Sequence, residues 1–123
     1  MLGFCAWTFA EYWVHRSLLH RFFWHGVHEN HHLHPSEYVT SIWWYTPLLF
    51  TVLFFIVPTS FFAGAAAGLV WFMLMHHWLH HIDLREHTWL HRYAIWHNRH
   101  HKFNDCNYGI TTPVWDWAFG TSR

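Results

Sequence analysis

The apolar pattern of the chain is dominated by one long uncharged stretch between Glu37 and Asp83. Residues 38–82 contain no Lys, Arg, Asp or Glu, whereas one helical crossing of a bilayer needs about 20 apolar residues. The stretch is therefore long enough for two crossings and too long for one. Because proline cannot continue a helix interior, we expect the break in the V-P-T-S segment at residues 57–60. The pattern predicts a transmembrane helical hairpin with arms at residues 42–57 and 61–81.

Two further features refine this hairpin. Its second arm carries the small residues A-G-A-A-A-G at positions 63–68, which let another helix approach closely. Residues 1–14 are also apolar, with Glu11 near their end, but they are too few to span a bilayer. We expect them to form a surface-lying helix or the remainder of a longer spanning segment. The alternative to a membrane hairpin is a buried hairpin in a soluble all-α protein.

The positive charges indicate an orientation. All seven basic residues lie outside the hairpin, at the end where its two arms meet: Arg16, Arg21, Arg85, Arg92, Arg99, Lys102 and Arg123. Because basic residues favour the cytoplasmic side, we expect this end to face the cytoplasm. The predicted fold is an all-α, membrane-embedded helical bundle with a cytosolic, histidine-rich helical cap, formed by a single domain over residues 1–123.

Composition supports a membrane protein and excludes other classes. Only 11% of residues are charged and 23% are aromatic, whereas an ordinary soluble domain has about 25% charged residues. Seven basic residues balance seven acidic ones, so no net positive field favours nucleic acid. The two cysteines, Cys5 and Cys106, form no C-x-x-C motif, and neither a disulfide framework nor a thiolate zinc site is indicated.

Histidine is the residue that carries candidate chemistry. The chain has 16 histidines, most of them in four groups: H-R-S-L-L-H (His15, His20), H-E-N-H-H (His28, His31, His32), H-H-W-L-H-H (His76, His77, His80, His81) and H-N-R-H-H (His97, His100, His101). On a helix, an H-x-x-H-H motif places three imidazoles on one stripe. Its adjacent pair diverges by about 100°, so one member can face one metal ion and its neighbour a second. The motifs therefore predict a dinuclear centre.

Two parts of this ligand set stay open at this point. His15 and His20 are five residues apart and would point about 140° away from each other on an α-helix, which favours flanking a pair of ions over sharing one. The third group can donate through His77, His80 and His81, as an H-x-x-H-H motif, or through the stripe of His76 and His80. The remaining histidines, His25, His34, His87 and His91, lie outside these patterns, and we expect them at the membrane interface or beside the ligands.

The type of donor atom narrows the choice of metal. Imidazole binds Zn, Cu, Fe and Ni, and thiolates and carboxylates are scarce in this chain. Ten imidazoles shared by two ions would leave one position open on each octahedral ion, whereas structural zinc is normally closed at four ligands. The count favours iron.

These motifs resemble the integral-membrane fatty acid hydroxylase and sterol desaturase superfamily. E-Y-W-V-H-R-S-L-L-H and H-E-N-H-H resemble its first two histidine boxes, and H-N-R-H-H with the later N-Y-G and W-D-W-A-F-G-T resembles its terminal segment. The four residues between His15 and His20 and the F-A-G-A-A-A-G segment from Phe62 are most similar to the fatty acid 2-hydroxylase branch. H-G-V-H, from His25 to His28, competes with H-E-N-H-H for the second box.

The resemblance implies a four-helix membrane enzyme with a histidine-bound diiron centre on the cytosolic side. The ligands carried over are His15, His20, His28, His31, His32, His76, His80, His97, His100 and His101. It also implies that the chain begins too late to hold the family's full first transmembrane hairpin.

The expected function is an oxygen-dependent lipid hydroxylase that acts on a fatty-acyl chain or a related lipid. It would use two iron ions, with zinc as a replacement in overexpressed protein, and O2 as co-substrate. Because no flavin or nicotinamide motif is present, electrons would come from an external cytochrome-b-type protein, ferredoxin or reductase. The location would be the endoplasmic reticulum in a eukaryote or the inner membrane in a bacterium. The alternatives are desaturation or C-methyl oxidation at the same centre, and a non-catalytic metal-binding membrane module.

Four carboxylates are candidates for supporting this centre. Glu11, Asp83, Asp105 and Asp116 could accept hydrogen bonds from ligand N–H groups. The alternative for each is a surface or capping role.

Overall fold

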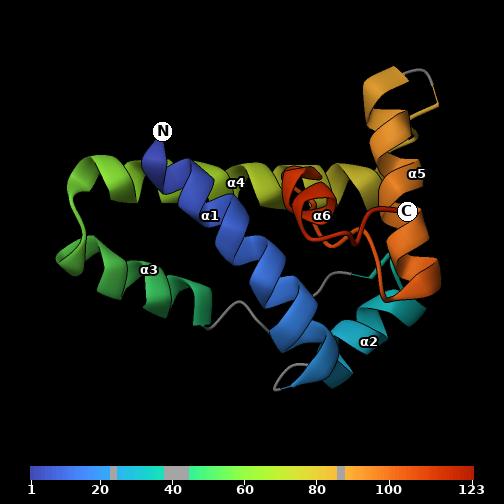
Figure 1. The fold of residues 1–123 in the computed structure, drawn as a ribbon, viewed down its shortest axis with the longest axis horizontal. Helices are drawn as coiled ribbons and strands as arrows, with labels where there is room; N and C mark the ends of the chain where they lie inside the picture. Colours follow the sequence, from blue (N-terminus) through green and yellow to red (C-terminus); the bar gives the residue numbers. More distant parts are fainter. Residues whose placement is uncertain (23–24, 38–44, 86–87) are drawn as a thin grey trace.

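The structure, a computed structural model, describes residues 1–22, 25–37, 45–85 and 88–123, and every regular element among them is a helix (Figure 1). The all-α prediction is confirmed for these residues. The elements are α1 (Leu2–Trp13), the π-helix η1 (Val14–Leu19), α2 (His25–Leu33), α3 (Tyr45–Ile56), α4 (Thr59–His81), α5 (Thr88–Phe103) and α6 (Val114–Ala118).

The predicted hairpin corresponds to α3 and α4, which turn at Pro58. This residue is the N-cap of α4, with φ −55° and ψ 142°, so its missing N–H costs no helical hydrogen bond. Placing the break in the V-P-T-S segment was therefore correct, although α4 already begins at Thr59. The first arm is described only from Tyr45 onward, and its predicted start at residues 42–44 lies outside the described residues.

One helix among the described residues is long and apolar enough to cross a membrane, and it is α4, with 23 residues. α3 is apolar but shorter, with 12 residues. Only 17% of the most apolar window of α4 is buried, and large apolar side chains such as Val70 and Met73 lie exposed on it. A core helix of a soluble protein would bury most of such a surface.

Close packing joins α1 to α4 through small residues. A Cβ atom added to Gly3 of α1 would clash with the backbone carbonyl of Phe61, and one added to Gly64 of α4 would lie 3.2 Å from the Cα of Gly3. Gly68 lies against the side chain of Trp7 in the same way. The expectation that the small residues receive a neighbouring helix is confirmed, and this contact brings the C-terminal end of α1 toward the histidines of α4.

A small apolar core supports the far end of α4. It is formed by Met75, Leu79, Leu84, Leu90 and Ile110, which come from α4, the connection between α4 and α5, α5 itself and the segment before α6. In Figure 1, α5 lies across the end of α4, and α2 lies beside the lower end of α5. Histidine-bearing elements are therefore gathered at one end of the molecule.

The close contact between α1 and α4 predicts that one methyl group added at Gly3 destabilises the fold. Gly3→Ala forces two helix backbones apart and should lower the free energy of unfolding by about 1–3 kcal/mol, the usual cost of overpacking. The thermal unfolding midpoint in one detergent measures the effect. Gly26→Ala is the matched control, because a Cβ at Gly26 meets nothing within 4 Å. Equal midpoints for both variants would contradict the packing.

Candidate metal centre

Ten histidines form two adjacent groups at the histidine-rich end of the molecule. Site 1 consists of His15, His20, His28, His32 and His100, and site 2 consists of His31, His76, His80, His97 and His101. Within each group, one nitrogen of every imidazole lies within 4.8 Å of the others. The structure thus brings together all ten residues named as candidate ligands, which come from η1 and its C-cap, α2, α4 and α5.

The adjacent histidines divide between the two sites as the helical geometry predicts. His31 enters site 2 and its neighbour His32 enters site 1, while His100 and His101 divide the opposite way round. Residues four apart stay together, because i and i+4 share a helix face. Each H-x-x-H-H motif therefore contributes to both sites.

The expectation that His15 and His20 point away from each other and flank a pair of ions was wrong. Both residues lie in site 1, with ring centroids 5.2 Å apart and planes inclined by 32°. The reason is that Val14–Leu19 forms a π-helix rather than an α-helix. Hydrogen bonds from i to i+5 bring residues five apart onto one face, so a pair that would diverge on an α-helix converges here.

The third group uses the stripe of His76 and His80. Both belong to site 2, whereas His77 and His81 are exposed and stack on each other with ring centroids 4.7 Å apart. The choice implied by the resemblance thus matches the grouping in the structure, and the H-x-x-H-H alternative does not.

The other histidines lie apart from the two sites. His25 is exposed and faces Glu29 at 3.4 Å, so the H-G-V-H alternative contributes only His28 to a site. His34 and His91 are exposed. His87 lies outside the described residues.

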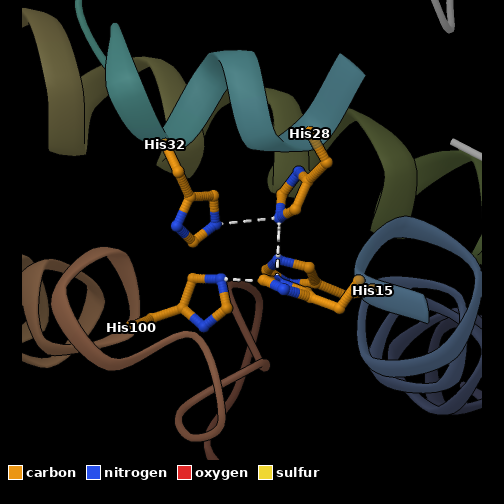
Figure 2. Close-up of side chains that lie close together, drawn as sticks. His15, His28, His32 and His100 are labelled. Atoms are coloured by element: carbon orange, nitrogen blue, oxygen red, sulfur yellow. Dashed lines mark hydrogen bonds between the residues drawn. The ribbon is translucent and has the colours of Figure 1, made fainter. Parts of the chain in front are cut away.

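The distances between nitrogens fit six-coordinate ions. In site 1, His28 Nε2 lies 2.9–3.0 Å from the Nε2 atoms of His15, His20 and His32, and Figure 2 shows the labelled rings turned toward one another. Three Nε2 pairs in site 2 are 2.9–3.1 Å apart. With metal–nitrogen bonds of about 2.1 Å, neighbouring ligands lie about 3.0 Å apart on an octahedral ion and about 3.4 Å apart on a tetrahedral one.

The hydrogen-bond capacity of the rings points to a cation. His15 Nδ1 lies 2.6 Å from the Tyr108 carbonyl, and His100 Nδ1 lies 2.7 Å from the Cys106 carbonyl. Both Nδ1 atoms must donate, so each neutral ring keeps only a lone pair on Nε2. One nitrogen of His28 also cannot form three ordinary hydrogen bonds at once. Converging lone pairs repel one another unless a positive charge lies between them, and the residues therefore fit a pair of metal ions.

Burial keeps these imidazoles in the neutral form that a metal site would require. Desolvation, followed by the neighbouring imidazoles, lowers the pKa of His15 and of His100 well below the ordinary histidine value. The same causes lower the pKa of His20 and of His31 to about 4. These imidazoles are therefore neutral at pH 7, and a metal ligand must be neutral to offer its lone pair.

The four candidate carboxylates take surface or capping roles. Asp83 pairs with Arg85 and Asp105 with Arg123 at the surface. Glu11 is buried and accepts hydrogen bonds from the backbone N–H groups of residues 110 and 111 at 2.7 and 2.8 Å. Asp116 caps residues 108 and 109 in the same manner. None of the four accepts a bond from a site histidine within the described part of the chain.

Sequence reasoning missed the groups that accept hydrogen bonds from the site 1 histidines His15 and His100. The acceptors for His15 and His100 are the backbone carbonyls of Tyr108 and Cys106. Every residue carries a carbonyl, so no residue type marks these positions. The N-Y-G motif at residues 107–109 was the one available signal, since it includes Tyr108.

Comparison with known proteins assigns the chain to a family. The sequence pattern of the fatty acid hydroxylase family matches residues 1–121. Similar proteins include a dihydroceramide fatty acyl 2-hydroxylase of Arabidopsis thaliana, 30% identical over 97% of this chain and 58% of the relative. A ceramide very long chain fatty acid hydroxylase of Schizosaccharomyces pombe is 31% identical over 98% of this chain and 41% of the relative. A fatty acid 2-hydroxylase of Mus musculus is 28% identical over 98% and 38%.

The protein belongs to the fatty acid hydroxylase family. It spans less than two thirds of the length of these curated relatives. No solved structure gives a significant match.

The two stripes of α4 allow a direct test of the ligand assignment. His76→Ala and His80→Ala should each lower the metal content from about two ions per chain to about one, because each removes a donor from site 2 and leaves site 1 intact. His77→Ala should keep both ions, because its ring lies on the other stripe. Elemental analysis at matched expression and detergent extraction measures the difference. Loss of metal in His77→Ala with retention in His76→Ala would overturn the assignment.

Proposed function

We propose that this protein is a dimetal, oxygen-dependent lipid hydroxylase that inserts a hydroxyl group into a fatty-acyl chain. The observation that carries the proposal is the pair of adjacent five-imidazole sites at the end of α4. The relatives support the substrate class, since their names include fatty acid 2-hydroxylase and dihydroceramide fatty acyl 2-hydroxylase. A fatty-acyl chain, free or within a ceramide, is therefore the proposed substrate.

The native metal is proposed to be iron at both sites. Five nitrogens leave one coordination position for oxygen chemistry on a six-coordinate ion, and the nitrogen spacing fits that geometry better than a tetrahedron. Two iron ions, with O2 as co-substrate, would supply the oxidising power to hydroxylate an unactivated C–H bond. Zinc binds imidazole sites more tightly than ferrous iron does, so overexpressed protein is expected to carry zinc in part.

The chain's own side chains supply position and a dry environment. His15, His97 and His100 are buried, with at most 3% of their surface exposed, so solvent is kept from one side of both sites. The sequence contains no flavin or nicotinamide motif. Electrons would therefore arrive from an external donor such as a cytochrome-b-type protein, a ferredoxin or a reductase.

The membrane placement is proposed from α3 and α4. Exposed apolar side chains cover both helices, and the 20 residue-to-residue steps from Ser60 to His80 span about 30 Å at about 1.5 Å per step. This length matches the hydrocarbon core of a bilayer, which is about 30 Å thick. The metal sites would then lie at the cytoplasmic surface of a multi-pass protein, in the endoplasmic reticulum or in a bacterial inner membrane.

Isotope labelling tests the proposed reaction. Iron-loaded protein in detergent, supplied with a reductant, isotopically labelled O2 and a fatty-acyl or ceramide lipid, should yield a lipid that carries one labelled oxygen atom. His100→Ala is the inactive control, because it removes a site 1 ligand. A product that lacks two hydrogens would indicate a desaturase instead. An unchanged lipid despite two bound irons would contradict an oxidising enzyme.

Cysteine accessibility tests the membrane topology. In a Cys5→Ser background, a Ser60→Cys variant should react with an impermeant thiol reagent only from the non-cytoplasmic face, because Ser60 lies in the first turn of α4, whose other end carries the metal sites. Removing Cys5 is necessary because that thiol is exposed, whereas Cys106 is buried. Ser122→Cys, near the exposed C-terminus, should label only from the cytoplasmic face. Labelling of both cysteines from the same face would refute the orientation.

A further inference from the structure

The two metal sites differ in the hydrogen-bond partners of the Nδ1 atoms, which lie on the side of each imidazole away from the site. In site 1, the Nδ1 atoms of His15 and His100 donate to backbone carbonyls. The Nδ1 atoms of His32 in site 1 and of His31 and His101 in site 2 are buried, and no hydrogen-bond partner for them lies among the described residues. Bonds to the distal nitrogen fix the tautomer and orientation of a metal-binding imidazole. Among the described residues, backbone carbonyls therefore fix two imidazoles of site 1, His15 and His100.

A single peptide group links His15 to a buried carboxylate. The carbonyl of Tyr108 accepts the Nδ1–H of His15, and the N–H of Gly109, at the other side of the same peptide bond, donates to Asp116 Oδ2 at 2.8 Å. Hydrogen bonds in such a series polarise one another. The Tyr108–Gly109 peptide group thus lies between the carboxylate of Asp116 and the imidazole of His15 and is hydrogen-bonded to both. Negative charge at Asp116 makes the Tyr108 carbonyl a stronger hydrogen-bond acceptor for His15.

Gly109 is required for this close approach. A Cβ atom at this position would lie 2.9 Å from Asp116 Oδ2 and would clash with the backbone carbonyl of Thr112. The N-Y-G motif thus places its glycine where the carboxylate must reach the backbone.

The peptide group that holds His100 has a neutral support instead. Its carbonyl, from Cys106, accepts the Nδ1–H of His100, and its N–H, from Asn107, donates to the backbone carbonyl of Thr121 at 2.9 Å. The turn is maintained by Asn107, which has φ 55° and whose side chain bonds to Arg123 and Trp96. Only the His15 link therefore ends on a charge.

The donors around Asp116 favour its ionised form. The side chain is fully buried and accepts bonds from Tyr108 N–H, Gly109 N–H and the Thr121 hydroxyl. Since Thr121 gives its one hydroxyl proton to Asp116, Tyr12 must donate to Thr121, and Arg16 in turn donates to Tyr12. The chain of donors runs from a partly exposed arginine to the buried carboxylate, and these donors oppose the effect of burial, which raises the pKa of Asp116.

We propose that Asp116 is a positioning residue for site 1 alone: acting through the Tyr108–Gly109 peptide group, it fixes the His15 ring and strengthens it as a ligand. The two ions of the centre are therefore held unequally, with the ion of site 1 bound more tightly. This inference rests on the proposed dimetal centre. In site 2, the buried Nδ1 atoms of His31 and His101 have no hydrogen-bond partner among the residues described.

Titration with Co(II) against a graded chelator tests the proposal. Wild-type protein should release two ions in two separate steps. Asp116→Asn should lower the affinity of one step by about 10–100-fold, the usual effect of removing an outer partner of a ligand, and leave the other step unchanged. Asp105→Asn is the matched control. It makes the same change of charge, but Asp105 lies in an exposed salt bridge with Arg123, in the segment between α5 and α6. It should titrate like wild type.

Paired variants identify the affected site. In a His80→Ala background, which leaves site 1 complete, Asp116→Asn should weaken the remaining Co(II) ion and shift its visible absorption bands. In a His15→Ala background, which leaves site 2 complete, the same substitution should change neither. Circular dichroism shows whether each variant keeps its helical content, so that loss of structure is separated from loss of a ligand's support.

The outcomes distinguish the two proposals. Binding of fewer than two Co(II) ions by wild-type protein would overturn the dimetal centre itself. Binding of two ions with no effect of Asp116→Asn in the His80→Ala background, or with equal effects in both backgrounds, would overturn the role of Asp116 and leave the centre intact.

Discussion

The structure depends on ten imidazole lone pairs that converge within a small volume. Each group of five brings its nitrogens within 4.8 Å of one another, and several pairs lie close to 3.0 Å apart. Neutral rings cannot satisfy all these contacts by sharing protons. Metal ions would convert this repulsion into the main link between η1, α2, α4 and α5. Because a site of this kind does not exist in an unfolded chain, binding of metal would be coupled to folding of this end of the molecule.

The C-terminal segment acts as a frame behind one half of the centre. Glu11 from α1 and Asp116 from α6 accept the backbone N–H groups of residues 108–111, and the carbonyls of the same segment hold His15 and His100. The N-Y-G and W-D-W-A-F-G-T motifs thus have a physical role. They shape a backbone turn whose carbonyls face site 1, although neither motif supplies a ligand.

α4 couples the apolar part of the molecule to the site. Its N-terminal half is packed against α1 through Gly64 and Gly68, and its C-terminal half carries His76 and His80 of site 2. In the proposed membrane placement, α4 would form one continuous element from the lipid to the metal sites, and its length would set their depth relative to the bilayer, since a helix rises about 1.5 Å per residue.

Local sequence patterns were enough to predict the hairpin turn and the division of neighbouring histidines between the two sites. Proline chemistry placed the hairpin turn at Pro58, and the divergence of neighbours on a helix divided His31 from His32 and His100 from His101. These features depend only on residues within one or two turns. The resemblance to a family, rather than periodicity, selected His76 and His80, because both stripes of α4 have equivalent spacing.

Tertiary structure decided the rest. The π-helix that turns His15 and His20 onto one face is not visible in residue spacing, because an α-helix is the default for the same residues. The carbonyls of Tyr108 and Cys106 reach their histidines through contacts across 93 and 6 residues, and a backbone group carries no signature in the sequence. Asp116 could be named as a candidate from its side chain, but its action through a peptide group required the folded turn around Gly109.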